Sequence, residues 1–190
     1  MKTKTVGLLG GSFDPAHDGH VNITKAALTC FDLNEVWWLV SPRNPLKNAS
    51  HASFSARLEF ASKIIQHPRL HVTGIERRIG TTYTADTLSA LTHSFPKIQF
   101  VWLMGADNLA QFDQWQQWER IMHTVPVGIL ARPGNRLAPL SARAARIYRS
   151  HRLPMPQSRL LAKAQVPSWC YVNLPMSYLS SSALRSGDDP

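Results

Sequence analysis

The sequence predicts an α/β protein with a Rossmann-like, doubly wound and mainly parallel sheet that has helices on both faces. Strand-like apolar runs alternate with segments of helical periodicity along the whole chain, an order that is typical of βαβ units. Some of these runs, such as Ile98–Gly105 with Gln99 as its one polar residue, are almost continuously apolar, as expected of strands that are covered on both faces. The length of 190 residues fits a single domain, 1–190, with a sizeable core.

The predicted elements follow one another at short intervals. Strands are expected at 5–10, 35–42, 70–76, 98–105, 125–134 and 169–175. Helices are expected at 20–31, 55–68, 84–95, 109–122 and 141–152, because apolar residues recur there at helical spacing. Ser53 or Ser55 is a suitable cap for the second helix and Thr84 for the third. The segment 152–167 contains several prolines and weak periodicity, which predicts a mobile loop.

Composition places the chain among ordinary globular proteins. It is 44% hydrophobic and 17% charged, as such proteins usually are. No apolar run approaches the length of a membrane span, and the first one reaches Asp14 too soon for a secretory signal. Two isolated cysteines, Cys30 and Cys170, do not form a disulfide framework. We expect a cytoplasmic protein with no membrane partner.

The formal net charge of +9 is unevenly distributed. The segment 132–163 has eight Arg or Lys residues and no Asp or Glu. Arg143, Arg146, Arg149 and Arg152 recur at every third position. A basic segment of this kind can bind nucleic acid, or it can be a solvated basic face. Aromatic residues do not interleave with these arginines as a base-stacking platform requires, so the second interpretation is favoured and no specific nucleic acid is expected.

The most informative segment is 10–20, GGSFDPAHDGH, which directly follows a strand-like apolar run. Glycines at the end of a strand let a ligand approach the backbone. The helix that follows begins with unpaired N–H groups and a partial positive charge, which attract anions. His17 and His20 add side-chain donors at the same place. The segment therefore predicts a phosphate-binding turn, although it matches neither the P-loop nor the dinucleotide-binding fingerprint.

The segment has two other interpretations. The two histidines could be half of a zinc site, but neither cysteine stands at a metal-ligand spacing from them, and no protein-built metal site is expected. The Gly-Gly and Asp-Pro pairs could also form a simple tight turn. That interpretation explains the glycines and the proline, but it does not explain the two histidines.

In doubly wound sheets, ligands bind beyond the carboxyl ends of the strands. We refer to each carboxyl end, with the residues that follow it, as the exit of the strand. Charged or polar residues follow most of the predicted strands. After the first exit, the relevant segments are 41–47, 76–78, 105–108 and 131–134.

Together these segments resemble the bacterial nicotinate mononucleotide adenylyltransferases, which belong to the nucleotidyltransferases with an HxGH signature. The resemblance covers GGSFDPAHDGH at 10–20, PRNPLK at 42–47, ERRIGTTYTADTL at 76–88, GAD with two tryptophans at 105–118, RPG at 132–134 and LSSSALR at 179–185. Departures from the family pattern include Ser12 in place of threonine and one residue fewer between Glu76 and Gly80. The TYTADTL and tryptophan segments resemble the branch of the superfamily that uses pyridine nucleotides.

The resemblance implies adenylyl transfer from ATP to nicotinate mononucleotide, giving nicotinate adenine dinucleotide and pyrophosphate in NAD biosynthesis. Mg²⁺ is expected to arrive with ATP. A homo-oligomer is compatible with the sequence. Two alternatives stay open: a related nucleotidyltransferase with another acceptor, such as nicotinamide mononucleotide or phosphopantetheine, or a basic RNA-binding protein.

The resemblance also implies the site residues. The catalytic ones are His17, His20 and Arg185. ATP would contact Gly10, Gly11, Ser12, Phe13, Lys47, Asp107, Ser181 and Ser182. Nicotinate mononucleotide would contact Asn44, Tyr83, Thr84 and Trp115, with the indole of Trp115 stacked on the pyridine ring. Helix capping by Asp107 and by the two serines, and core packing by Trp115, are the structural alternatives.

Overall fold

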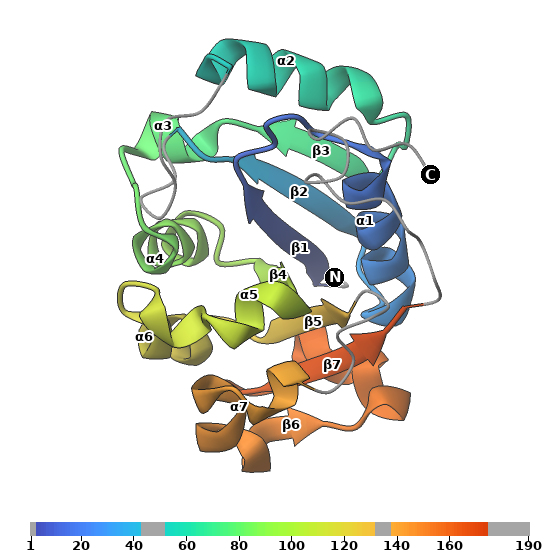
Figure 1. The fold of residues 1–190 in the computed structure, drawn as a ribbon, viewed down its shortest axis with the longest axis vertical. Helices are drawn as coiled ribbons and strands as arrows, with labels where there is room; N and C mark the ends of the chain where they lie inside the picture. Colours follow the sequence, from blue (N-terminus) through green and yellow to red (C-terminus); the bar gives the residue numbers. More distant parts are fainter. Residues whose placement is uncertain (1–2, 43–51, 132–137, 175–190) are drawn as a thin grey trace.

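A seven-stranded sheet with the order β3-β2-β1-β4-β5-β7-β6 runs through the protein, and all its neighbouring strands are parallel (Figure 1). The computed structural model describes residues 3–42, 52–131 and 138–174. The strands are β1 (Lys4–Gly11), β2 (Glu35–Val40), β3 (Leu70–Thr73), β4 (Ile98–Gly105), β5 (Val127–Ala131), β6 (Arg152–Leu153) and β7 (Trp169–Asn173). The predicted Rossmann-like, parallel α/β fold is confirmed.

Helices connect the strands and cover both faces of the sheet (Figure 1). The α-helices are α1 (Asp18–Cys30), α2 (Phe54–Ile64), α3 (Ile75–Ile79), α4 (Thr84–Ser94), α5 (Ala106–Ala110), α6 (Trp118–Thr124) and α7 (Arg143–Ile147). The 3₁₀ helices are η1 (Phe112–Gln114), η2 (Ala138–Ser141), η3 (Arg149–His151) and η4 (Met155–Lys163). Ser53 caps α2, since its hydroxyl accepts a hydrogen bond from the N–H of Ala56. α4 begins at Thr84 itself, with Tyr83 as its N-cap residue.

Side chains that alternate along the strands divide the core in two. On β4, Phe100, Trp102 and Met104 pack with residues of α4, α5, α6 and α7. The intervening Val101 and Leu103 pack on the opposite face, with residues of α1, α2 and η4. Because a strand directs successive side chains to opposite faces, a continuous apolar run supplies both halves of the core.

The chain reverses its direction across the sheet between β1 and β4. From β1 it proceeds outward through β2 to β3, and it then returns to place β4 on the other side of β1. The carboxyl ends of two adjacent strands at such a reversal diverge and leave a crevice for a ligand. Gly11 ends β1 and Gly105 ends β4, so the phosphate-binding turn predicted from the sequence stands at this position.

The segment 109–122, predicted as one helix, is divided into α5, η1 and α6. Gln117 has a left-handed backbone conformation with φ of 54°, which interrupts the helix. The break brings three aromatic rings together. The ring of Phe112 lies edge-on to Trp115 at 5.4 Å and to Trp118 at 5.8 Å. Packing of these rings overrides the helical periodicity of the segment.

Three further segments differ from the prediction. The third strand ends at Thr73, and the short helix α3 takes the place of its last residues. The predicted helix 141–152 is shorter and ends in the 3₁₀ helix η3. The segment 152–167, expected to be a loop, instead forms β6 and η4. Leu161 of η4 is fully buried in the core beside α1, and this burial gives regular structure to a segment that lacks clear periodicity.

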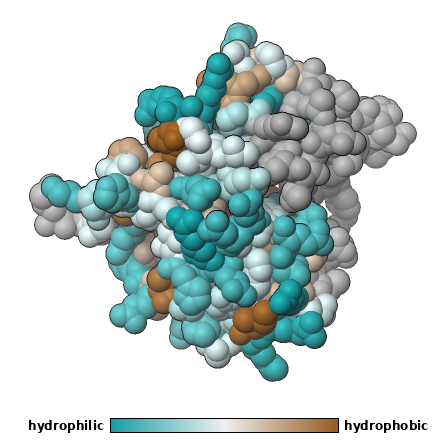
Figure 2. Space-filling model, turned by 90° about the vertical axis from the view of Figure 1, so that its left-hand side faces the viewer, coloured by the Kyte–Doolittle hydropathy of each residue, from teal (hydrophilic) through white to brown (hydrophobic). Residues whose placement is uncertain are grey.

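One side of the molecule is mostly hydrophilic, with apolar residues in small separate groups (Figure 2). This is the side on which α4 and α6 lie in Figure 1. Among the described residues, no helix is long and apolar enough to cross a membrane.

Candidate active site at the end of strand β1

The two predicted catalytic histidines cap the first helix. His17 is the N-cap residue of α1, and its Nδ1 accepts a hydrogen bond of 3.0 Å from the N–H of Gly19. His20 reaches back, and its Nδ1 accepts one of 3.3 Å from the N–H of His17. This reciprocal arrangement is a capping box built from histidines. The sequence therefore predicts correctly that both histidines stand at the start of this helix.

The capping bonds also determine which nitrogen of each ring carries a proton. A ring nitrogen that accepts a hydrogen bond carries no hydrogen, so a neutral imidazole then holds its hydrogen on Nε2. Both His17 and His20 use Nδ1 as the acceptor. Their Nε2–H groups are thus hydrogen-bond donors, the type of group that a phosphate oxygen requires. Helix α1 has 13 residues, and its N-terminus adds a partial positive charge at the same place.

A stack of aromatic rings supports the two histidines. Phe13 lies face to face with Trp38 of β2, with ring centroids 4.7 Å apart and an interplanar angle of 7°. His20 lies 5.0 Å from the ring of Phe13, and His17 lies 3.9 Å from the ring of His20. The indole N–H of Trp38 donates to Thr24 of α1. The stack joins the exits of β1 and β2 to the first helix.

Phe13 adopts a left-handed backbone conformation, with φ of 47°. For a bulky residue this conformation is unfavourable by about 1–2 kcal/mol, so the surrounding structure must maintain it. Phe13 is 2% exposed and stacks on Trp38. Unfavourable conformations that packing enforces occur often at functional sites, and Phe13 is itself one of the predicted ATP contacts.

The two glycines of the turn make room for the protein's own side chains. A Cβ on Gly10 would lie 2.5 Å from Cη2 of Trp102, and a Cβ on Gly11 would lie 3.2 Å from the ring of Phe13. The sequence interpretation, in which a ligand uses the space left by the missing Cβ atoms, is therefore wrong for both residues. The rings of Trp102 and Phe13 occupy that space. The roles of the two glycines as ATP contacts stay predictions that concern the backbone.

Sequence reasoning missed Arg57, a buried arginine of α2 that is 3% exposed. Its Nη1 donates to the carbonyl of Ser12 and, over 3.0 Å, to that of Ser41. Its Nη2 donates over 3.2 Å to the carbonyl of Pro42, and its Nε over 3.3 Å to that of Ala52. Arg57 therefore joins the exits of β1 and β2.

Two of the residues predicted to bind the pyridine nucleotide, Tyr83 and Thr84, lie at the turn between α3 and α4. Tyr83 is 36% exposed and precedes the first residue of α4, Thr84. Behind the turn lies Glu76, a buried carboxyl. Thr87 donates to its Oε1 over 3.3 Å, whereas Oε2 is buried and has no hydrogen-bond partner among the described residues. Burial raises the pKa of Glu76 to about 7.

Asp107 and Trp115 lie after β4. Asp107 is exposed in the first turn of α5, and its carboxylate lies against Gly105. Trp115 is half-buried and stands edge-on to Trp102 at 6.3 Å. Because Trp102 also covers Gly10, one indole connects the tryptophan segment with the exit of β1. The packing around Trp115 agrees with the structural alternative, in which this side chain belongs to the core. Its stacking on the pyridine ring stays a prediction.

Five predicted residues lie outside the described part of the chain. They are Asn44, Lys47, Ser181, Ser182 and Arg185, and their roles stay predictions. Within residues 3–42, 52–131 and 138–174, no group of three or more His, Cys, Asp or Glu residues is placed to hold a metal ion.

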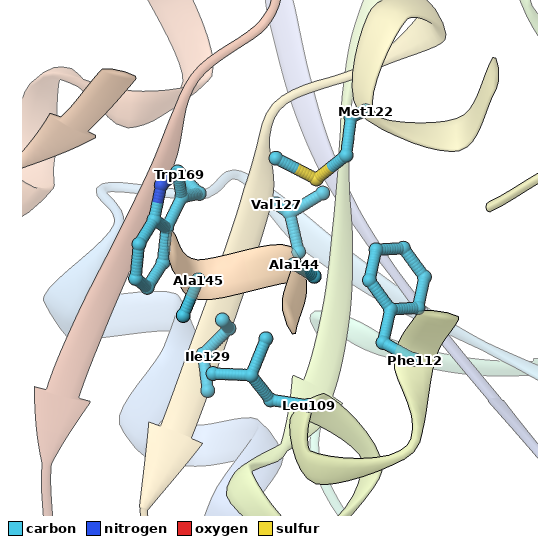
Figure 3. Close-up of a pocket in the computed structure, with 8 residues that line it drawn as sticks. All are labelled: Leu109, Phe112, Met122, Val127, Ile129, Ala144, Ala145 and Trp169. Atoms are coloured by element: carbon cyan, nitrogen blue, oxygen red, sulfur yellow. The ribbon is translucent and has the colours of Figure 1, made fainter. Parts of the chain in front are cut away.

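A small cavity lies away from these residues, between β5, β7 and the helices α5, α6 and α7 (Figure 3). Only apolar and aromatic side chains line it: Leu109, Phe112, Met122, Val127, Ile129, Ala144, Ala145 and Trp169. The indole N–H of Trp169 donates to the carbonyl of Tyr148 over 2.7 Å. Because its lining residues are apolar or aromatic and the indole N–H of Trp169 is already bonded, this cavity is a packing gap in the core and no site for a nucleotide.

Comparison with known proteins agrees with this arrangement. The sequence model described as cytidylyltransferase-like matches residues 8–187. A relative from Ruegeria sp. (strain TM1040), named probable nicotinate-nucleotide adenylyltransferase, is 55% identical over 95% of this chain and 96% of its own. A relative of the same name from Parvibaculum lavamentivorans is 48% identical over 95% of this chain and 90% of its own.

Solved structures share the fold. A nicotinic acid mononucleotide adenylyltransferase from Plasmodium falciparum, in complex with NaAD, matches with a TM-score of 0.71 and 18% identity, over 96% of this chain and 83% of its own. At this identity the match concerns the fold alone, while the closely similar sequences establish the family. The chain belongs to the cytidylyltransferase-like family, in its group of nicotinate-nucleotide adenylyltransferases.

Proposed function

We propose that this protein transfers the adenylyl group of ATP to nicotinate mononucleotide and releases pyrophosphate, a step of NAD biosynthesis. The observation that carries the proposal is the pair of histidines at the start of α1, both with Nδ1 bound to a backbone N–H and both at the reversal point of the sheet. The names of relatives that are about half identical over nearly the whole chain support the same reaction.

The reaction requires alignment and charge neutralisation more than acid or base catalysis. A phosphate oxygen of nicotinate mononucleotide attacks the α-phosphorus of ATP, and the bond from that phosphorus to the bridging oxygen of pyrophosphate breaks. The attacking oxygen is anionic near neutral pH, so no base is needed. Donors fixed in advance stabilise the charge that develops on the leaving pyrophosphate. His17, His20 and the N-terminus of α1 supply such donors.

The remaining contacts in this proposal are those that the resemblance to the family implies. Mg²⁺ enters as part of the MgATP substrate. Lys47 and Arg185, with the hydroxyls of Ser181 and Ser182, bind phosphate oxygens. On the acceptor side, the start of α4 at Thr84 receives the nicotinate carboxylate, assisted by Tyr83 and Asn44, and Trp115 stacks on the pyridine ring. Asp107 binds a ribose hydroxyl.

The identity of the acceptor is the more specific part of the proposal, and it can be tested by comparing the rates with two acceptors. We expect nicotinate mononucleotide to support pyrophosphate release with a kcat/KM at least about tenfold above that of nicotinamide mononucleotide, because a helix N-terminus favours a carboxylate over a neutral amide. The measurement is continuous detection of pyrophosphate with MgATP and each acceptor. Equal values would remove the acid preference, and activity with phosphopantetheine alone would remove the proposed acceptor.

The alternative of an RNA-binding protein rests on the basic segment. Arg143, Arg146 and Arg149 are exposed on α7 and η3, and Tyr148 between them is buried and unable to stack on a base. The relatives named as enzymes favour catalysis.

A cytoplasmic location is also part of our proposal. Cys30 and Cys170 are both free thiols, and a reducing compartment keeps thiols in this state.

Replacing Arg143, Arg146 and Arg149 together by glutamine should leave kcat/KM for adenylyl transfer within about twofold of the parent value. The reason is that α7 precedes β6, at the edge of the sheet, whereas the histidines lie beside β1. Retention on heparin at increasing salt should fall in the same variant, since such binding depends on charge. A loss of catalysis in a folded triple variant would show that the basic helix contributes to the site.

A further inference from the structure

We infer that Arg57 is a positioning residue for adenylyl transfer, because it orients the Ser12–Phe13 peptide at the exit of β1 against the exit of β2. The inference rests on the proposed function and deepens it. Arg57 does not belong to the HxGH signature or to any segment that carries the resemblance to the family. Its role follows from the position of its guanidinium.

The guanidinium binds main-chain carbonyls from three separate segments. Its acceptors are the carbonyls of Ser12, Ser41, Pro42 and Ala52. The acceptors at Ser12 and Ser41 are 45 and 16 residues away from Arg57 in the sequence. Four of the five N–H groups of an arginine are used in these bonds. Arg57 thus acts as a fork that joins the residues following β1 and β2 with the residue Ala52 that precedes α2.

The bond to Ser12 fixes the orientation of one peptide group. In a trans peptide the C=O and the N–H that follows point in opposite directions. Because the carbonyl of Ser12 points to Arg57, the N–H of Phe13 points away from the guanidinium. Ser12 and Phe13 are predicted contacts of ATP, and a backbone N–H is a donor that suits a phosphate oxygen.

The exit of β2 is held at the same time. The N–H of Ser41 donates to the carbonyl of Gly11 over 2.9 Å, and the hydroxyl of Ser41 donates to it over 3.1 Å. Arg57 binds the carbonyl of the same Ser41. Ser41 therefore holds the Gly11–Ser12 peptide, and Arg57 holds the Ser12–Phe13 peptide that follows it. This constraint helps to hold Phe13 in its left-handed conformation against Trp38.

The charge of Arg57 is buried at the base of the turn. Burial lowers the pKa of its guanidinium, and the negative charge of Asp14 acts in the opposite direction. An arginine nevertheless stays protonated in proteins. A positive charge beside the Ser12–Phe13 peptide is favourable for the binding of a polyanion nearby.

Replacement of Arg57 by lysine tests the role of the fork, because lysine keeps the charge but has its three donors on one nitrogen atom. We expect kcat of Arg57→Lys to fall by about tenfold to a hundredfold, since a small misplacement of aligned groups has effects of this size. KM for nicotinate mononucleotide should change by a smaller factor than kcat, because the carbonyls that Arg57 binds belong to Ser12, Ser41, Pro42 and Ala52 and not to Tyr83 or Thr84. A small guanidinium compound at millimolar concentration should restore part of kcat in Arg57→Ala.

A matched control is Arg69→Lys. Arg69 also donates to a main-chain carbonyl, that of Leu33, but at the opposite end of the sheet. Its replacement should leave kcat and KM unchanged. Denaturation by urea gives the free energy of unfolding of each variant, so that activity is compared among folded proteins. If Arg57→Lys does not fold, Arg57→Gln, which buries no charge, takes its place.

The outcomes separate this inference from the proposed function. If the parent protein forms no dinucleotide, the proposed function fails, and the affinity for ATP measured by calorimetry still tests Arg57. An active parent together with normal kcat in a folded Arg57 variant would overturn the inference alone. Failure of both the lysine and the glutamine variant to fold would assign Arg57 a purely structural role and would likewise overturn it.

Discussion

Replacement of His20 by alanine should lower kcat about a hundredfold or more while the protein stays folded. The loss of one donor that stabilises developing charge commonly has an effect of this size. His20 also contributes the second bond of the capping box, from the N–H of His17 to its Nδ1. A capping interaction is worth about 1 kcal/mol, so the free energy of unfolding should fall only modestly. Steady-state kinetics and urea denaturation of the same preparation measure the two effects separately.

A second variant distinguishes catalysis from helix capping. Asparagine is a favourable N-cap residue, so His17→Asn should keep the stability of α1 but lose the imidazole donor. We expect a loss of kcat similar to that of His20→Ala, with a free energy of unfolding close to that of the parent. His71→Ala is the control, since His71 is an exposed residue of β3 beside Glu35. Turnover of His20→Ala within a fewfold of the parent would refute the assigned role.

Replacement of Glu76 by glutamine should change how stability depends on pH. The pKa of Glu76 is raised from 4.5 to about 7 in the folded protein, so the unfolded chain loses this proton at lower pH than the folded one. Ionisation of Glu76 therefore destabilises the fold as pH rises from about 4.5 to 7, and the full penalty applies above pH 7. Between pH 5 and pH 8 the parent should lose about 2 kcal/mol of unfolding free energy through this group.

The glutamine variant should not show this loss. Any constant effect of the substitution, such as an amide group without a partner at the position of Oε2, is present at both pH values and cancels in the comparison. Urea denaturation at pH 5 and pH 8 measures the difference. Glu59→Gln is the control, since Glu59 is exposed on α2 and paired with Lys63. The same pH dependence in Glu76→Gln and in the parent would show that Glu76 is ionised in the fold without penalty.

The sequence predicts the glycine turn and the two histidines of the site well, because the interactions that position them are local. A strand, two glycines and a helix start follow one another directly, and the two histidines bind backbone groups within three residues of themselves. The parallel sheet is equally predictable, because continuous apolar runs alternate with helical segments. Such features depend on residues that are neighbours in the chain.

Other parts of the site depend on residues that are far apart in the chain. On sequence alone, Arg57 is one charged residue in an amphipathic helix, and its acceptors come from distant segments. The ring of Trp102 over Gly10 joins two strands that pair only in the fold. The interruption of the helix at Gln117 depends on packing of aromatic rings. Periodicity and motifs carry no information on these contacts.

The fate of each phosphorus atom of ATP tests the central claim most directly. The protein is incubated with nicotinate mononucleotide and MgATP that carries a label on either the α- or the γ-phosphorus, and the products are separated. The proposed reaction places the α-label in nicotinate adenine dinucleotide and the γ-label in pyrophosphate, in equal amounts. Release of the γ-label as inorganic phosphate, or absence of the α-label from a dinucleotide, would contradict adenylyl transfer.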